Sequence, residues 1–138
     1  MNKLLRTAAV VATLMTAPAI VSAAPQSPPT KRYVFIVMTN AVEGKEAEFN
    51  DWYTNVHLHD LLKVPGVKAA QRYVVAKENK DPGSHKYLAI YEIETSDLTA
   101  TQKAMMAMAG TPDMVISPAL DRTSASAIYF EELTPKVK

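Results

Sequence analysis

The order of the apolar patterns along this chain constrains its fold more than any other feature. Four runs have the length and composition of β-strands, and two stretches repeat apolar residues at helical spacing. The predicted strands cover residues 33–38, 67–76, 87–93 and 125–131, and the predicted helices cover residues 45–64 and 97–109. This order predicts an α+β, ferredoxin-like βαββαβ domain, a four-stranded antiparallel sheet with both helices on one face.

The ends of the predicted helices carry recognisable stop and start signals. Pro65-Gly66 should end the first helix, because Pro disfavours helical geometry in the residue before it. Ser96 is expected to cap the second helix and Gly110 to end it.

Two helices can cover only one face of such a sheet. The other face would still present apolar and aromatic side chains, and a domain of this length has no further element to cover it. A second copy of the same sheet is the simplest cover. The sequence therefore predicts a homodimer that closes a dimeric α/β barrel.

The N-terminal segment has the order of a secretory signal peptide. Lys3 and Arg6 precede a short apolar run, and Val21-Ser22-Ala23 offers small residues at the positions that signal peptidase reads. We therefore expect a signal peptide at residues 1–23, a Pro-rich linker at 24–31 and one domain at 32–133. The expected location is the periplasm or the extracellular medium, with no membrane contact after cleavage.

The composition excludes several kinds of partner and site. The 138 residues carry 15 basic and 14 acidic side chains, a formal net charge of +1, which is not typical of a nucleic-acid-binding protein. The chain has no Cys, so disulfides and thiolate metal sites are excluded. With only 4 Gly and no phosphate-binding loop after a strand, a nucleotide cofactor is not expected. We predict that the protein uses no cofactor.

The first predicted helix holds the residues most suited to chemistry. At 100° per residue its buried face would carry Phe49, Trp52, Tyr53 and Val56. Trp52 and Tyr53 are expected as core anchors, and Trp52 could also stack on an aromatic ligand.

Asp60 falls near the middle of that face and His57 at its edge. Two interpretations stay open. In the first, Asp60 accepts hydrogen bonds from backbone amides or an Arg, and His57 lies at the surface. In the second, both residues line a pocket between helix and sheet, where the carboxylate brings the pKa of the imidazole near neutral pH. His57 and His59 diverge too far on a helix to bind one metal, and no metal site is expected.

Arg72 is the second candidate, on the strand that follows. Its side chain should project with those of Ala70 and Val74 into an apolar layer, where it needs an anion. Asp60, Glu92 or a substrate carboxylate or phenolate could supply that charge. Two tyrosines of the sheet could donate hydrogen bonds to an oxyanion, Tyr73 and Tyr91.

Several short motifs together resemble the EthD-like branch of the dimeric α/β-barrel superfamily. They are Phe49-Asn-Asp-Trp-Tyr53, His57-x-x-Asp60, Val64-Pro-Gly-Val67, Ala70-x-Arg-Tyr73 and Tyr87-Leu-Ala-Ile-Tyr-Glu92. The resemblance implies a ferredoxin-like protomer, a dimer formed through the sheets, and a site at Trp52, Tyr53, His57, Asp60 and Arg72 with the His as acid or base. His59 stands where that family commonly has Pro, so the helix is expected to run on, and His59 is kept as a candidate substrate contact.

The superfamily includes cofactor-free monooxygenases, lactone isomerases, polyketide cyclases or dehydratases and haem-binding enzymes. The first hypothesis is therefore a cofactor-independent lyase, isomerase or dehydratase that acts on a small aromatic, phenolic or lactone-like substrate. His57 would transfer the proton, oriented by Asp60, and Arg72 would stabilise the resulting oxyanion. The alternatives are a periplasmic small-molecule binding module and a monooxygenase that is cofactor-free or uses haem with His57 as axial ligand.

Overall fold

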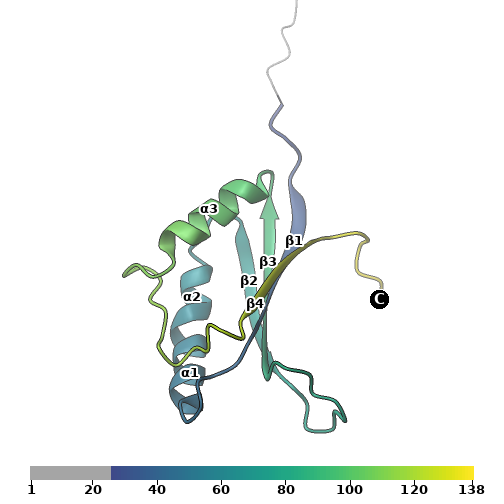
Figure 1. Ribbon diagram of the computed structural model, residues 1–138. Helices are drawn as coiled ribbons and strands as arrows, with labels where there is room; N and C mark the ends of the chain where they lie inside the picture. The colour runs from purple at the N-terminus through teal and green to yellow at the C-terminus, as the bar shows by residue number, and fades with distance from the viewer. Residues whose placement is uncertain (1–25) are drawn as a thin grey trace, which may run out of the picture.

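The computed structural model describes residues 26–138, so the predicted signal peptide lies outside the described residues (Figure 1). Four strands form the sheet, and the helices follow β1 and β3. The elements are β1 (Lys31–Thr39), α1 (Glu46–Trp52), the π-helical turn η1 (Tyr53–His57), α2 (Leu58–Leu61), β2 (Val67–Val74), β3 (Tyr87–Thr95), α3 (Leu98–Met108) and β4 (Ser126–Glu131). No helix in this range is long and apolar enough to cross a membrane.

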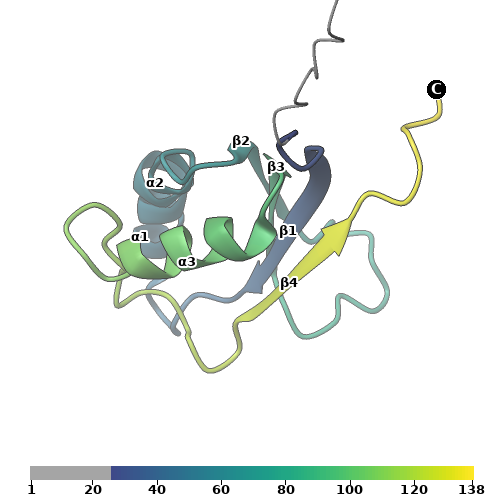
Figure 2. The same cartoon turned by 90° about the horizontal axis from the view of Figure 1, so that it is seen from above.

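The sheet has the strand order β2-β3-β1-β4, and every neighbouring pair is antiparallel. The helices of the described residues all lie on one face of the sheet, as the view from the side and the view from above both show (Figures 1 and 2). The predicted ferredoxin-like α+β fold is therefore confirmed, with β2 and β4 as the two edge strands.

The first helix differs from its prediction. It is interrupted by the π turn η1 and ends at Leu61, four residues before Pro65, although it does continue past His59. The second helix is capped by Asp97 and not by Ser96, because the Asp97 carboxylate accepts a hydrogen bond from the Ala100 amide at 2.9 Å.

The core fills the layer between the helices and the sheet. Phe49 and Tyr53 from the first helix pack against Tyr91 and Ile93 of β3, and all four are at most 2% exposed. Met105 of α3 closes the same cluster from the other helix. Burial of this aromatic layer is the main stabilising contribution to the protomer.

The opposite side of the sheet, which we call the open face, is not covered by any helix of residues 26–138 (Figure 2). Ile36 of β1 lies between Ile90 of β3 and Ile128 of β4 in the strand register, so these side chains form one row across the sheet. On this face Ile128 is 43% exposed and Phe130 is 49% exposed. The apolar open face that the sequence predicts is therefore present.

Candidate functional site

The π turn η1 sets the orientation of the candidate residues on the first helix. A π turn hydrogen-bonds residues five apart, whereas an α-helix bonds residues four apart. It therefore brings the rings of Trp52 and His57, five residues apart, into a stack with a centroid distance of 4.6 Å and an interplanar angle of 26°. The same change turns Val56 outward to 42% exposure, so the prediction that Val56 lies on the buried face is wrong.

His57 lies against aromatic rings and is half-buried. Besides the stack on Trp52, its ring is nearly perpendicular to the Tyr53 ring, with a centroid distance of 5.0 Å and an interplanar angle of 89°. Its Nδ1 atom is buried and has no hydrogen-bond partner in the described part of the chain.

Burial lowers the pKa of His57 from 6.5 to about 4. The negative charge of Asp60 acts in the opposite direction and raises this pKa, whereas the positive charge of Arg72 lowers it by a smaller amount. The expectation of an imidazole tuned near neutral pH is therefore wrong for this protomer.

Asp60 is buried as predicted, at 7% exposure, but its partner is unexpected. The carboxylate binds the ammonium group of Lys63 at 2.7 Å, one turn further along the chain. Among residues 26–138 no hydrogen bond joins Asp60 to His57. Asp60 thus acts on His57 through its charge, and the predicted orientation of the imidazole by this carboxylate is not observed.

Arg72 reaches from the edge strand β2 to the first helix and finds neutral acceptors there. Nη2 donates to the side-chain oxygen of Asn50 at 2.9 Å, and Nη1 donates to the Thr54 hydroxyl at 2.7 Å and to the Asn50 carbonyl at 3.4 Å. Within the described range neither Asp60 nor Glu92 forms an ion pair with Arg72. The predicted position of Arg72 in the layer is confirmed, while both protein anions proposed for it are wrong.

Three aromatic rings form cation–π contacts with the Arg72 guanidinium. Its central carbon lies 4.4 Å from the ring centroid of Tyr53 and 5.3 Å from those of Phe49 and Tyr87. Burial lowers the pKa of Arg72, and the guanidinium still carries its charge at neutral pH. Tyr53 therefore contacts both candidate groups, Arg72 and His57.

The remaining predicted residues separate into two groups. Trp52 donates to the Val115 carbonyl at 3.0 Å, and the Tyr91 hydroxyl donates to that of Tyr53 at 3.3 Å. Burial raises the pKa of Tyr91 far above its ordinary value, so its hydroxyl stays protonated. Tyr73 lies on the open face and His59 is exposed, so neither belongs to the cluster around His57 and Arg72 in this protomer.

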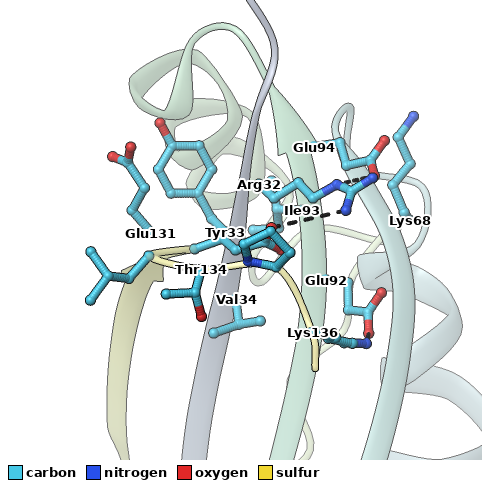
Figure 3. Close-up of a pocket in the computed structure, with 13 residues that line it drawn as sticks. Arg32, Tyr33, Val34, Lys68, Glu92, Ile93, Glu94, Glu131, Thr134 and Lys136 are labelled. Carbon is cyan, nitrogen blue, oxygen red and sulfur yellow. Dashed lines mark hydrogen bonds and ion pairs between the residues drawn. The ribbon is translucent and has the colours of Figure 1, made fainter. Parts of the chain in front are cut away.

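A large hollow lies elsewhere, on the open face. It has a volume of about 700 Å³ and is bounded by the ends of β1 and β3 and by the C-terminal residues, as Figure 3 shows. Glu92 points into it and pairs with Lys136 at 3.5 Å. Glu92, which was predicted as a partner of Arg72, lines this hollow, and none of the other predicted site residues does. The His57 ring packs instead against Trp52 and Tyr53, between the helix and the sheet.

Sequence reasoning missed the polar residues that hold Arg72. Asn50 and Thr54 are four residues apart, the spacing that puts two side chains on one side of a helix. The Asn50 amide also donates to the Tyr87 hydroxyl at 2.9 Å, and that hydroxyl donates to Glu46. The spacing of Asn50 and Thr54, together with an Arg on the following strand, was the signal in the sequence that could have predicted these contacts.

We expect His57 to make the stability of the protein depend on pH. The folded pKa of about 4 lies below the ordinary 6.5, so the unfolded chain binds the proton more readily. The stability that the neutral imidazole contributes to the folded protein is complete above pH 6.5 and is lost as the pH falls from 6.5 to 4. Chemical denaturation measures the unfolding free energy at each pH. Between pH 6.5 and 4 the unfolding free energy of wild type should fall by up to ~3 kcal/mol more than that of His57→Gln.

His59→Gln, which removes an exposed histidine of the same helix, is the matched control and should lose stability as wild type does. Equal pH dependence in wild type and His57→Gln would show that the imidazole is not held in its neutral form.

Comparisons with known proteins agree with this architecture. A crystal structure of an ethyl tert-butyl ether d (EthD) family protein from Bacillus halodurans matches with a TM-score of 0.53 and 18% identity, over 74% of this chain and 99% of the other. The heme-degrader MhuD from Mycobacterium tuberculosis, with two hemes bound in its active site, matches with a TM-score of 0.50 and 20% identity, over 76% and 99%. At these identities the likeness shows the fold.

A search of curated proteins finds no match. The chain does match a family model over residues 32–109, which is more than half of its length. The protein therefore belongs to the family described as a domain of unknown function, DUF4286, and shares the fold of EthD-type proteins.

Proposed function

We propose that this protein is a cofactor-independent enzyme of the lyase, isomerase or dehydratase type that transfers a proton on a small aromatic, phenolic or lactone-like substrate. The observation that carries the proposal is the placement of an uncharged imidazole and an uncompensated guanidinium on one aromatic ring, that of Tyr53. Such chemistry needs a group that exchanges a proton and a charge that stabilises the anion formed.

His57 is the proton-transferring group of this proposal. Its Nδ1 is buried, whereas Nε2 has no hydrogen bond and is not among the buried unpartnered atoms of the described chain. Nε2 is therefore the atom that can meet a substrate. It would take a proton from the substrate, leave the electron pair on an enolate or phenolate, and return the proton at another atom of the product.

Arg72 would stabilise the negative charge while the proton is on His57. A guanidinium that is fixed before the reaction stabilises a developing oxyanion without reorganisation, which is the most effective form of electrostatic catalysis. Its charge also opposes protonation of His57, so the imidazole returns the proton readily.

Haem does not fit the residues of this site. A histidine that binds a metal usually donates its second ring N–H to a carboxylate or carbonyl, and His57 Nδ1 has no such acceptor in the described structure. We therefore assign no step to haem.

A second candidate function is a small-molecule binding module. The low pKa of His57 favours it, because a base whose pKa is near 4 accepts a proton less readily at neutral pH than one tuned to 7. A binder would use the same Arg72 and aromatic rings without proton transfer.

Deuterium wash-in distinguishes the two functions. Small aryl ketones and aromatic lactones are incubated with the protein in D₂O, and exchange at the carbon next to the carbonyl is followed by NMR. We expect exchange by wild type, a loss of about 10²–10⁴-fold in His57→Gln, and compound affinity within a few-fold of wild type. Since the neutral imidazole is the base, the rate should hold down to about pH 5 and fall as the pH passes about 4.

His59→Gln should exchange as wild type does. Compounds that bind to wild type without exchange, or an exchange rate that His57→Gln leaves unchanged, would favour the binding module and reject His57 as the base.

We also propose that the protein is a homodimer formed through the open face. An apolar surface of the kind that monomers rarely leave uncovered is formed by the row of Ile36, Ile90 and Ile128 together with the half-exposed Phe130.

We further propose that the protein is located in the periplasm or the extracellular medium. Mass spectrometry of the exported chain should then find Ala24 as the first residue.

Sedimentation equilibrium tests the dimer. We expect wild type at twice the protomer mass and Ile128→Glu at the protomer mass, because a carboxylate buried in the interface would lack a partner. Val115→Glu, at an exposed Val on the helical side, is the control and should stay dimeric. A monomeric wild type would contradict the proposed dimer.

A further inference from the structure

Arg72 uses only part of its hydrogen-bonding capacity. A guanidinium has five N–H donors, and three hydrogen bonds of Arg72 are present in the described structure. Asn50 accepts from both Nη1 and Nη2 through its carbonyl and its side-chain oxygen, so it occupies the end of the guanidinium. Thr54 takes the remaining hydrogen of Nη1.

The two donors left over are Nε–H and the second hydrogen of Nη2. These two N–H bonds are parallel and form the side edge of the guanidinium, which matches the two oxygens of a carboxylate. Nε has no partner and is not among the buried unpartnered atoms of residues 26–138, so this nitrogen keeps some contact with solvent.

The surroundings of Arg72 leave its charge uncompensated. Its acceptors are an amide, a hydroxyl and a backbone carbonyl, and all are neutral. The nearest carboxylate of the hydrogen-bond network, Glu46, is bound by Lys86 and by the Tyr87 hydroxyl. A half-buried cation without an anion costs free energy that binding of an anion would recover.

Asn50 fixes the direction in which the open edge points. A guanidinium only donates, so the Asn50 oxygen faces Arg72 and the amide nitrogen faces Tyr87, to which it donates at 2.9 Å. Tyr87 in turn donates to Glu46, which anchors the chain of hydrogen bonds. An Asp at this position could accept from Arg72 in the same geometry, but it would neutralise the guanidinium and could not donate to Tyr87.

We propose that the side edge of Arg72 is a binding site for a substrate carboxylate and that Asn50 is the positioning residue that aims this edge and keeps it uncompensated. The inference rests on the proposed function and deepens it, because it names an aromatic or phenolic carboxylate as the substrate class. Removal of a proton next to that carboxylate would convert it into an enediolate, so the group that Arg72 binds would also be the one on which the negative charge develops. The rings of Tyr53, Phe49 and Tyr87 pack against the guanidinium and restrict its position.

Benzoate and its neutral analogue benzamide test the inference. Each is titrated into the protein while the guanidinium N–H signals of Arg72 are followed by ¹⁵N NMR, assigned by their absence in Arg72→Gln. We expect benzoate to shift the Arg72 Nε signal saturably and benzamide to leave it unchanged. Asn50→Asp and Thr54→Asp should each weaken benzoate binding by at least about 10-fold. Thr54→Asp keeps the hydrogen bond from Asn50 to Tyr87 and should have a melting temperature no lower than that of wild type.

Asn55→Asp is the matched control, because it makes the same change in net charge on the same helix, where Asn55 is bonded to Asp51 and not to Arg72. It should bind benzoate as wild type does. Equal binding of benzoate and benzamide, no saturable shift in wild type, or full affinity in Asn50→Asp would each overturn the inference.

His57→Gln separates this inference from the proposed function. Benzoate affinity should stay unchanged in that variant even if the wild-type enzyme shows no proton exchange, because the carboxylate edge does not involve the imidazole.

Discussion

The stacking of the Arg72 guanidinium on the Tyr53 ring is the interaction on which the site depends. It holds a cation 4.4 Å from a buried aromatic ring and joins the edge strand β2 to the first helix. The same ring is nearly perpendicular to the His57 ring and in contact with it, so proton transfer and anion stabilisation both depend on the position of Tyr53. Because Tyr53 is only 2% exposed, the position of both groups is set by the core and not by a mobile loop.

The fold was predictable because it follows from hydrophobic periodicity. The strand runs around Phe35 and Tyr91 and the helical spacing from Phe49 to Tyr53 indicate the elements and their order directly. Burial of Asp60 could also be predicted from its position on the helical face. These features depend on spacing alone, and spacing is visible in one sequence.

The arrangement of the site was less predictable, and the π turn explains why. A constant 100° per residue puts Val56 inside and His57 at the edge, whereas η1 turns Val56 outward and stacks His57 on Trp52. The polar partners were also hidden. Whether Arg72 meets a carboxylate or the neutral Asn50 depends on the packing of β2 against α1, and no short-range pattern records it.

Neutrality of His57 beside a charged Arg72 is the central claim, and a pH titration of the His57 ring by NMR tests it most directly. The account predicts a midpoint near pH 4 in wild type and a higher midpoint in Arg72→Gln, where the repelling charge is gone. A midpoint at 6.5 or above that does not respond to Arg72→Gln would show that the imidazole is solvated and apart from the guanidinium, and the proposed site would be contradicted.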